Sequence, residues 1–187
     1  FWDHVPNMEN FGQCSFCRVP ESLEHIMLEC NAPGQNQIWQ LAEKLWRFRF
    51  NSWPRLNWGL LLGCALPKFK SPKGHSVPAQ NRFFKMIVST SMHFIWRLRN
   101  DRVLGTAKLA AESEIHNLWV SKINSTLKRD KLLTNRTRFG DLAIKKQLVL
   151  NTWSGTLLDE DSLPDDWIKS NGVLVGMRPT TRKNGVG

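Results

Sequence analysis

Three cysteines and one histidine near the start of the chain carry its strongest chemical signal. Cys14, Cys17, His25 and Cys30 follow the spacing C-x2-C-x7-H-x4-C. Thiolates and imidazoles are the ligands that Zn²⁺ prefers, and four of them close a tetrahedral structural site, whereas a catalytic zinc keeps one position for water. The spacing therefore predicts a zinc ion that staples the fold.

The residues between the two ligand pairs fit this interpretation. Pro20 and Glu21 predict a turn, and Ser22 is placed to cap a short helix that carries His25 and ends near Cys30. Such a helix brings its two ligands close together across little more than one turn. Disulfides or free thiols remain the alternative use of these cysteines.

The fourth cysteine lies apart from this cluster. Cys64 sits in an apolar run, and no secretory signal is visible, so an extracellular disulfide framework is disfavoured. We expect Cys64 to be a small buried hydrophobic residue. The ligand spacing also differs from that of retroviral zinc knuckles, zinc deaminases and two-cysteine, two-histidine fingers.

Positive charge is concentrated in the middle of the chain. The formal net charge of +10 divides into −2 over residues 1–50, +4 over 51–81, +9 over 82–146 and −1 over 147–187. A concentrated positive field favours a polyanion, most simply RNA or DNA. The alternative is a solvated helical surface whose acidic counterpart belongs to another domain.

Candidate contacts to a nucleic-acid backbone come from this central region. Trp96 and Trp119 are candidates for stacking on bases, although their helical spacing favours a place in the core. Lys128 and Arg129 also complement the dipole at the end of their helix, which is a structural reason for their presence. The predicted phosphate contacts are Arg97, Arg99, Arg102, Lys128, Arg129, Arg136 and Arg138.

Apolar residues at helical spacing predict a mostly α fold. We expect a zinc-binding module at 1–33, a basic helical domain at 34–150 and an irregular acidic tail at 151–187. In the tail, Trp153 and Trp167 are placed to pin the acidic segment to the body, and residues 172–176 read as a short strand. The predicted helices span residues 35–49, 79–104, 112–132 and 141–150, with a short helix or buried loop at 57–66 and a basic loop at 67–78.

No residue pattern in the chain predicts catalysis. The acidic segment around Asp165 and Asp166 offers carboxylates, but such segments are more often solvated surface than metal-ion catalytic sites. No nucleophile elbow or phosphate-binding glycine loop is present. No apolar run approaches the length of about 20 residues that a membrane helix needs. We expect a non-enzymatic protein that does not enter a membrane.

The chain resembles a known family over nearly its whole length. The segment from Phe1 to Cys30, with Glu21-Ser22 ahead of His25, resembles the zinc-binding domain that follows the reverse transcriptase of LINE-type (non-LTR) retrotransposons. The remainder resembles the C-terminal tail of these polyproteins in basidiomycete fungi. The segments that carry this second resemblance are Asn81-Arg82, residues 93–99, residues 133–136, residues 152–155 and residues 157–167.

The resemblance implies a zinc site at Cys14, Cys17, His25 and Cys30 and a role in holding RNA or DNA during reverse transcription. It also implies upstream endonuclease and polymerase regions, often with a ribonuclease H. The chain holds none of these motifs and begins at Phe1 rather than methionine, so we expect a fragment. A module that packs on the upstream polymerase region, or a decayed element copy, remains an alternative. The implied location is nuclear or cytoplasmic.

Overall fold

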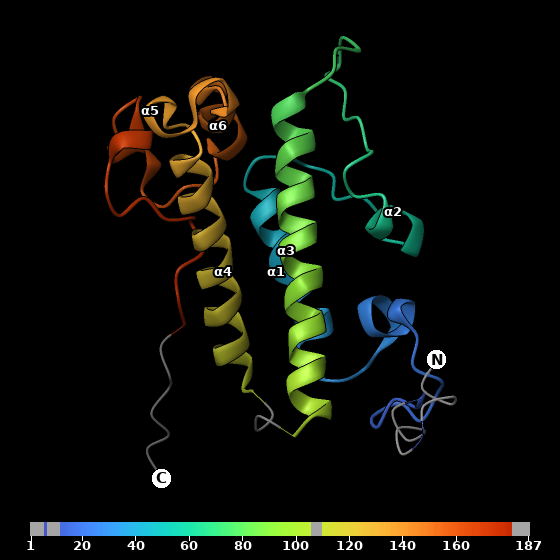
Figure 1. Ribbon diagram of the computed structural model, residues 1–187. Helices are drawn as coiled ribbons and strands as arrows, with labels where there is room; N and C mark the ends of the chain where they lie inside the picture. The colour runs from blue at the N-terminus through green and yellow to red at the C-terminus, as the bar shows by residue number, and fades with distance from the viewer. Residues whose placement is uncertain (1–5, 7–11, 106–109, 181–187) are drawn as a thin grey trace.

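The computed structural model describes residue 6 and residues 12–105 and 110–180 of the chain. Within these ranges the fold is mostly helical, as predicted, and no strand forms. Three long helices, α1 (Gln35–Arg47), α3 (Pro78–Val103) and α4 (Glu112–Leu132), each pack against the other two (Figure 1). The shorter helical segments are η3 (His25–Glu29), α2 (Trp58–Leu62), α5 (Arg136–Phe139), η4 (Gly140–Leu142), α6 (Lys146–Trp153), η5 (Glu160–Ser162) and η6 (Trp167–Lys169).

Aromatic side chains fill the centre of this three-helix arrangement. Trp46 of α1 is fully buried and stacks on Phe83 of α3, with ring centroids 6.1 Å apart. Phe83 in turn meets the edge of Trp153 from α6, at 5.4 Å. Trp119 of α4 is also fully buried, and its indole N–H donates to the Ser91 hydroxyl at 3.0 Å. Removal of these large apolar surfaces from water is the main force that holds the helices together.

One ionic network crosses the core and joins α3, α4 and α6. The carboxylate of Asp130 is buried and accepts two bonds from the Arg82 guanidinium. The indole N–H of Trp153 donates to the same carboxylate at 2.8 Å. A buried charge is stable only when it is paired and hydrogen-bonded in this way. The network therefore fixes how the three helices are placed relative to one another.

The helices match the predicted ones at α1, α3 and α4, but the helix predicted at 141–150 is misplaced. Its residues instead begin in η4, and the regular helix α6 starts only at Lys146. Gly140 has a left-handed backbone (φ 53°), and Ala143 is extended, so a continuous helix cannot run through this segment. The short helix α2 forms within 57–66, and the basic segment 67–78 is largely a loop.

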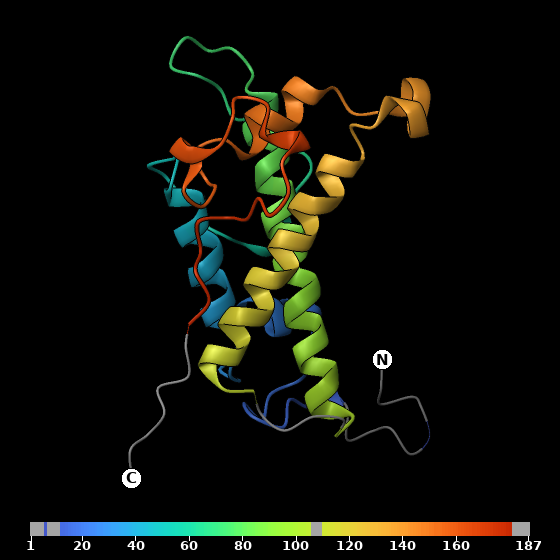
Figure 2. The ribbon, with the colours of Figure 1, turned by 90° about the vertical axis from the view of Figure 1, so that its left-hand side faces the viewer.

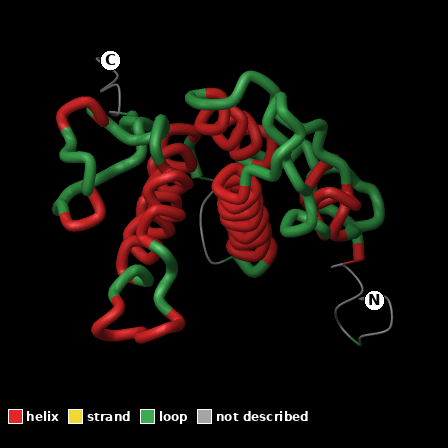
Figure 3. The backbone as a smooth tube through the Cα atoms, turned by 90° about the horizontal axis from the view of Figure 1, so that it is seen from above, coloured by secondary structure: helices red, strands yellow, loops and turns green. Residues whose placement is uncertain are grey.

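The C-terminal segment is held by its tryptophans. Trp153 and Trp167 are both buried, as predicted. The stretch 172–176, predicted as a strand, forms only one isolated bridge, between Val175 and Leu157. The segment before α1 and the segment after α6 lie on opposite sides of α3 (Figure 1; Figure 3).

Candidate metal centre

The first two cysteines lie on a tight turn that ends in a left-handed residue. The Cys14 N–H donates to the Val19 carbonyl, and the Arg18 N–H donates to the Cys14 carbonyl, each at 2.9 Å. Arg18 has φ 59°, a conformation that few non-glycine residues adopt. An antiparallel bridge between Gln13 and Pro20 closes the base of the turn. These contacts hold the Cys14 and Cys17 side chains near one another.

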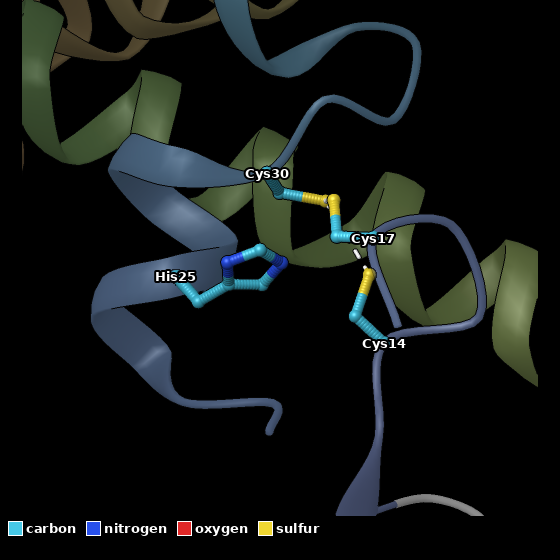
Figure 4. A group of neighbouring side chains, drawn as sticks. All are labelled: Cys14, Cys17, His25 and Cys30. Atoms are coloured by element: carbon cyan, nitrogen blue, oxygen red, sulfur yellow. Dashed lines mark hydrogen bonds between the residues drawn. The ribbon is translucent and has the colours of Figure 1, made fainter. Parts of the chain in front are cut away.

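The other two ligands lie on a short helix with a widened last turn. The Ser22 hydroxyl accepts the N–H of His25 at 3.0 Å, so the predicted cap is present. The Cys30 N–H donates to the His25 carbonyl at 2.8 Å, which is an i→i+5 bond of the π-helical kind. In a regular α-helix, residues five apart point about 140° away from one another. The wide turn instead lets the Cys30 and His25 side chains point toward the same centre (Figure 4).

The predicted grouping of Cys14, Cys17, His25 and Cys30 is confirmed. Their ligand atoms all lie within 4.8 Å of one another, and the side chains point toward a common centre (Figure 4). The sulfur of Cys30 is 3.7 Å from that of Cys14 and 4.0 Å from that of Cys17. An ion bound at about 2.3 Å from each sulfur in a tetrahedron would separate the sulfurs by about 3.8 Å. A disulfide would bring two sulfurs to about 2 Å, and all four cysteines of the chain are free thiols.

The imidazole of His25 has one nitrogen to spare. Its Nε2 is buried and has no hydrogen-bond partner among the described residues. Its Nδ1 lies 3.7 Å from a carboxylate oxygen of Glu29. A metal-bound histidine commonly directs its second nitrogen at a carboxylate, which orients the ring. The donor set therefore fits one metal ion bound through Nε2 and three sulfurs.

The thiols differ in their readiness to ionise. Burial opposes ionisation of Cys14, but hydrogen bonds from the backbone of Cys17 and Phe16 and the nearby side chains of His25 and Cys30 lower its pKa to about 7. Burial, together with the neighbouring Cys14 and Cys17 sulfurs, raises the pKa of Cys30 to about 12. Three crowded thiolates are therefore costly without a cation among them, and a divalent metal removes this cost.

Backbone amides also point at two of the sulfurs. The Asn31 N–H donates to the Cys17 sulfur at 3.3 Å, and the Ala32 N–H donates to the Cys30 sulfur at 3.5 Å. Such bonds favour the charged thiolate over the neutral thiol. The segment that connects the ligands to α1 therefore also stabilises the thiolate forms of Cys17 and Cys30.

Close packing joins this centre to the helical body. Ile26 and Met27, between the ligands, belong to the same buried cluster as the cores of α1, α3 and α4. The Met27 carbonyl accepts from the Trp39 indole and the Gln35 amide, each at 2.7 Å. Gly34 has φ 105°, and a side chain there would come within 2.8 Å of Leu98. The ligand segment and the helices therefore share one core.

Of the seven side chains predicted to contact nucleic acid, five are exposed and two are already engaged with other residues of the chain. The prediction for Arg99 does not fit its position, because its side chain is buried in an ion pair with Glu21. Arg102 is half-buried, with its guanidinium 5.6 Å from the ring of Phe16. Both arginines thus hold the ligand segment against α3. The remaining five are exposed and form no ion pair with a described residue: Arg97, Lys128, Arg129, Arg136 and Arg138.

Sequence reasoning missed the supporting roles of Glu21 and Glu29. Glu29 stands four residues after His25 on the same helix, and this spacing is a signal that could have identified it. Glu21 pairs with a residue 78 positions away, so no local pattern indicates the contact. Cys64 is only partly buried and packs at the edge of the core, away from the cluster. Trp96 is half-buried beside Arg99, and Trp119 lies in the core.

No family model, curated protein or solved structure matches this chain. No helix in the described ranges is long and apolar enough to cross a membrane.

Proposed function

We propose that this protein is a zinc-stapled helical module that binds RNA or DNA through the surface formed by α4 and α5. The observation that carries the proposal is the set of exposed cations on these helices that form no ion pair with a carboxylate of the described residues. Lys128 and Arg129 lie on the last turns of α4, and Arg136 and Arg138 lie on α5. Unpaired surface cations attract the phosphate backbone and release its counterions.

The position of α5 supports contact with a large polyanion. α5 and the turn that follows it project from the end of α4, away from the helical body (Figure 2). The Ile144 N–H donates to the Leu133 carbonyl at 2.9 Å, and this bond joins the two ends of the projecting segment. Its two arginines are therefore presented on a defined structure. Arginine suits phosphate because its guanidinium can donate two parallel bonds.

The metal is zinc, and its role is structural. Three thiolates and one imidazole are a soft donor set of the kind that selects Zn²⁺ over Mg²⁺ or Ca²⁺. Four protein ligands leave no open position for a reactive water, so the site supports folding rather than catalysis. We accordingly propose that the protein is not an enzyme.

We further propose that the protein derives from the region after the reverse transcriptase of a LINE-type retrotransposon of fungal type. The sequence resemblance supports this origin. Several of the segments that carry the resemblance hold the fold together, among them Arg82 and Trp153 of the buried network. The nucleic acid would be element RNA or target DNA, and the protein would work in the nucleus or cytoplasm.

A salt titration of nucleic-acid binding tests the proposal. Fluorescence anisotropy of labelled single-stranded RNA, single-stranded DNA and duplex DNA would be measured over a range of salt concentrations. If the four exposed cations of this surface each neutralise one phosphate, log Kd should rise with log salt with a slope of about 2.8 to 3.6. A flat response, or no binding at low salt, would contradict the proposed function.

One cavity favours a second candidate function, which is docking to a protein partner. A cavity of about 940 Å³ lies between α4 and residues 168–179, and it combines apolar side chains such as Leu132 and Leu174 with the cations Lys128, Lys131 and Lys169. This lining suits an acidic segment with apolar side chains from the upstream polymerase region. Binding of the purified polymerase region, lost in a Leu132→Asp variant, would favour this candidate.

A further inference from the structure

The surface between α3 and α4 contains a groove whose lining is polar and cationic. It has a volume of about 380 Å³ and lies on the face where the two helices meet. No carboxylate of residues 12–105 or 110–180 lines it. The lining consists of Ser89, Thr90 and His93 from α3 and Lys122, Ser125, Thr126 and Arg129 from α4.

Two cations of the groove are held in place but have no acidic partner in the described part of the chain. The Lys122 ammonium lies 5.2 Å from the centroid of the Phe94 ring, which restrains its long side chain. The Arg129 guanidinium donates to the Thr126 hydroxyl at 3.3 Å. The Arg129 guanidinium has five N–H donors in total. Several of its donors are therefore free for a ligand.

Hydroxyl groups complete the groove. Thr90 and Thr126 lie 3.4 Å apart across the two helices, and Ser89 and Ser125 are exposed beside them. The hydroxyls of Ser89, Ser125 and Thr126 donate to backbone carbonyls of their own helices, at 3.4, 2.9 and 3.1 Å. The hydroxyls therefore make the lining polar, and the two cations supply the free donors for a ligand.

From this arrangement we infer that the α3–α4 groove binds the phosphodiester backbone of the nucleic acid, with Lys122 and Arg129 contacting phosphate. This inference rests on the proposed function and assigns it a location. Lys122 and Arg129 are two helical turns apart on the same face of α4, a distance of about 10 Å. The groove is thus long enough for more than one phosphate of a strand.

The groove also borders the larger cavity on the other side of α4. Ser125 lines both hollows, so the exposed ridge of α4 has cations on each side. Lys122 and Arg129 face the α3 side, and Lys128 and Lys131 face the other. A strand that lies in the groove can therefore extend across α4 toward Lys128 and the arginines of α5.

The test uses paired variants with the same change of charge. Lys122→Gln/Arg129→Gln removes both groove cations, and Lys44→Gln/Arg55→Gln removes one exposed lysine and one exposed arginine outside the groove. Anisotropy titrations with labelled RNA and DNA would be run over the same salt range for the full chain. Circular dichroism would show that each variant keeps its helices.

We expect the groove variant to lose roughly 25- to 60-fold in affinity at 0.1 M salt and its salt slope to shrink by about 1.4 to 1.8. The control variant should keep most of its affinity.

The two proposals fail in different ways. If the wild-type chain binds nucleic acid but the groove and control variants behave alike, the groove is the wrong location and the proposed function stands. If the wild-type chain binds no nucleic acid at any salt concentration, the proposed function is wrong and the inference about the groove falls with it.

Discussion

At the scale of single residues, the turn between the first two ligands depends on Arg18. Its left-handed conformation (φ 59°) costs a non-glycine residue about 1 to 2 kcal/mol. Arg18→Gly relieves this strain but adds freedom to the unfolded chain, so zinc affinity should change by less than about threefold. Arg18→Val should weaken zinc binding by about 1 kcal/mol more, because a β-branched side chain tolerates this conformation poorly. Competition with a chromophoric chelator would measure both zinc affinities. An equal loss of zinc affinity in the two variants would contradict a role for the Arg18 conformation.

Removal of one ligand should be far more damaging than a change in the turn. Cys17→Ser leaves three ligands, and zinc affinity should fall by more than the roughly 10- to 100-fold that follows loss of a supporting contact. The ligand segment should lose its order while α3 and α4 keep their helicity, because their packing does not use Cys17. Cys64→Ser, which changes the cysteine outside the cluster, is the matched control and should retain one zinc per chain. Equal metal content in the two variants would refute the ligand assignment.

Residue patterns identified the cysteine and histidine cluster but not which cations are exposed. Short spacings and specific donor types make Cys14, Cys17, His25 and Cys30 readable from sequence. Arg97 and Arg99 are close together in the same basic stretch of sequence, and nothing local distinguishes them. Only the fold shows that Glu21 pairs with Arg99. The exposure of a charged side chain depends on distant partners, so local periodicity cannot predict it.

At the scale of elements, the helices depend on the buried network around Asp130. Asp130→Asn removes the negative charge but keeps the shape, which leaves the Arg82 guanidinium facing a neutral amide in the core. The free energy of unfolding should fall by about 3 kcal/mol. Asp166→Asn breaks a more exposed pair with Lys146 and should cost less than about 1 kcal/mol. Urea denaturation of the two variants measures this difference, and similar midpoints would contradict it.

The ends of a helix could be predicted where apolar residues recur at helical spacing without a break. They could not be predicted where the backbone leaves the helical conformation although the spacing continues. α4 spans the predicted residues because its stripe of Ile115, Trp119, Ile123 and Leu127 is unbroken. The segment before α6 has apolar residues at helical spacing too, but Gly140 and the extended Ala143 interrupt it. The wide turn from His25 to Cys30 was also not predicted, because its i→i+5 bond has no clear signature in sequence.

At the scale of the whole molecule, the metal centre and the projecting α5 lie at opposite ends (Figure 1). A chelator should therefore lower the stability of the fold more than it lowers nucleic-acid binding. Loss of zinc releases Ile26 and Met27 from the shared core, and the melting temperature should fall by about 2–4 °C for each kcal/mol lost. The salt slope of binding should change by less than one at temperatures where α4 stays folded. A slope that collapses on chelation would instead place the phosphate contacts on the ligand segment.

We infer that Cys14, Cys17, His25 and Cys30 enclose one zinc ion, and the other properties of the ligand segment depend on this ion. X-ray absorption at the zinc edge, on protein with its metal content determined, tests this directly. We predict one zinc per chain with three sulfurs at about 2.3 Å and one nitrogen at about 2.0 Å. A chain without metal, or a zinc shell with fewer than three sulfurs, would contradict the closed structural site.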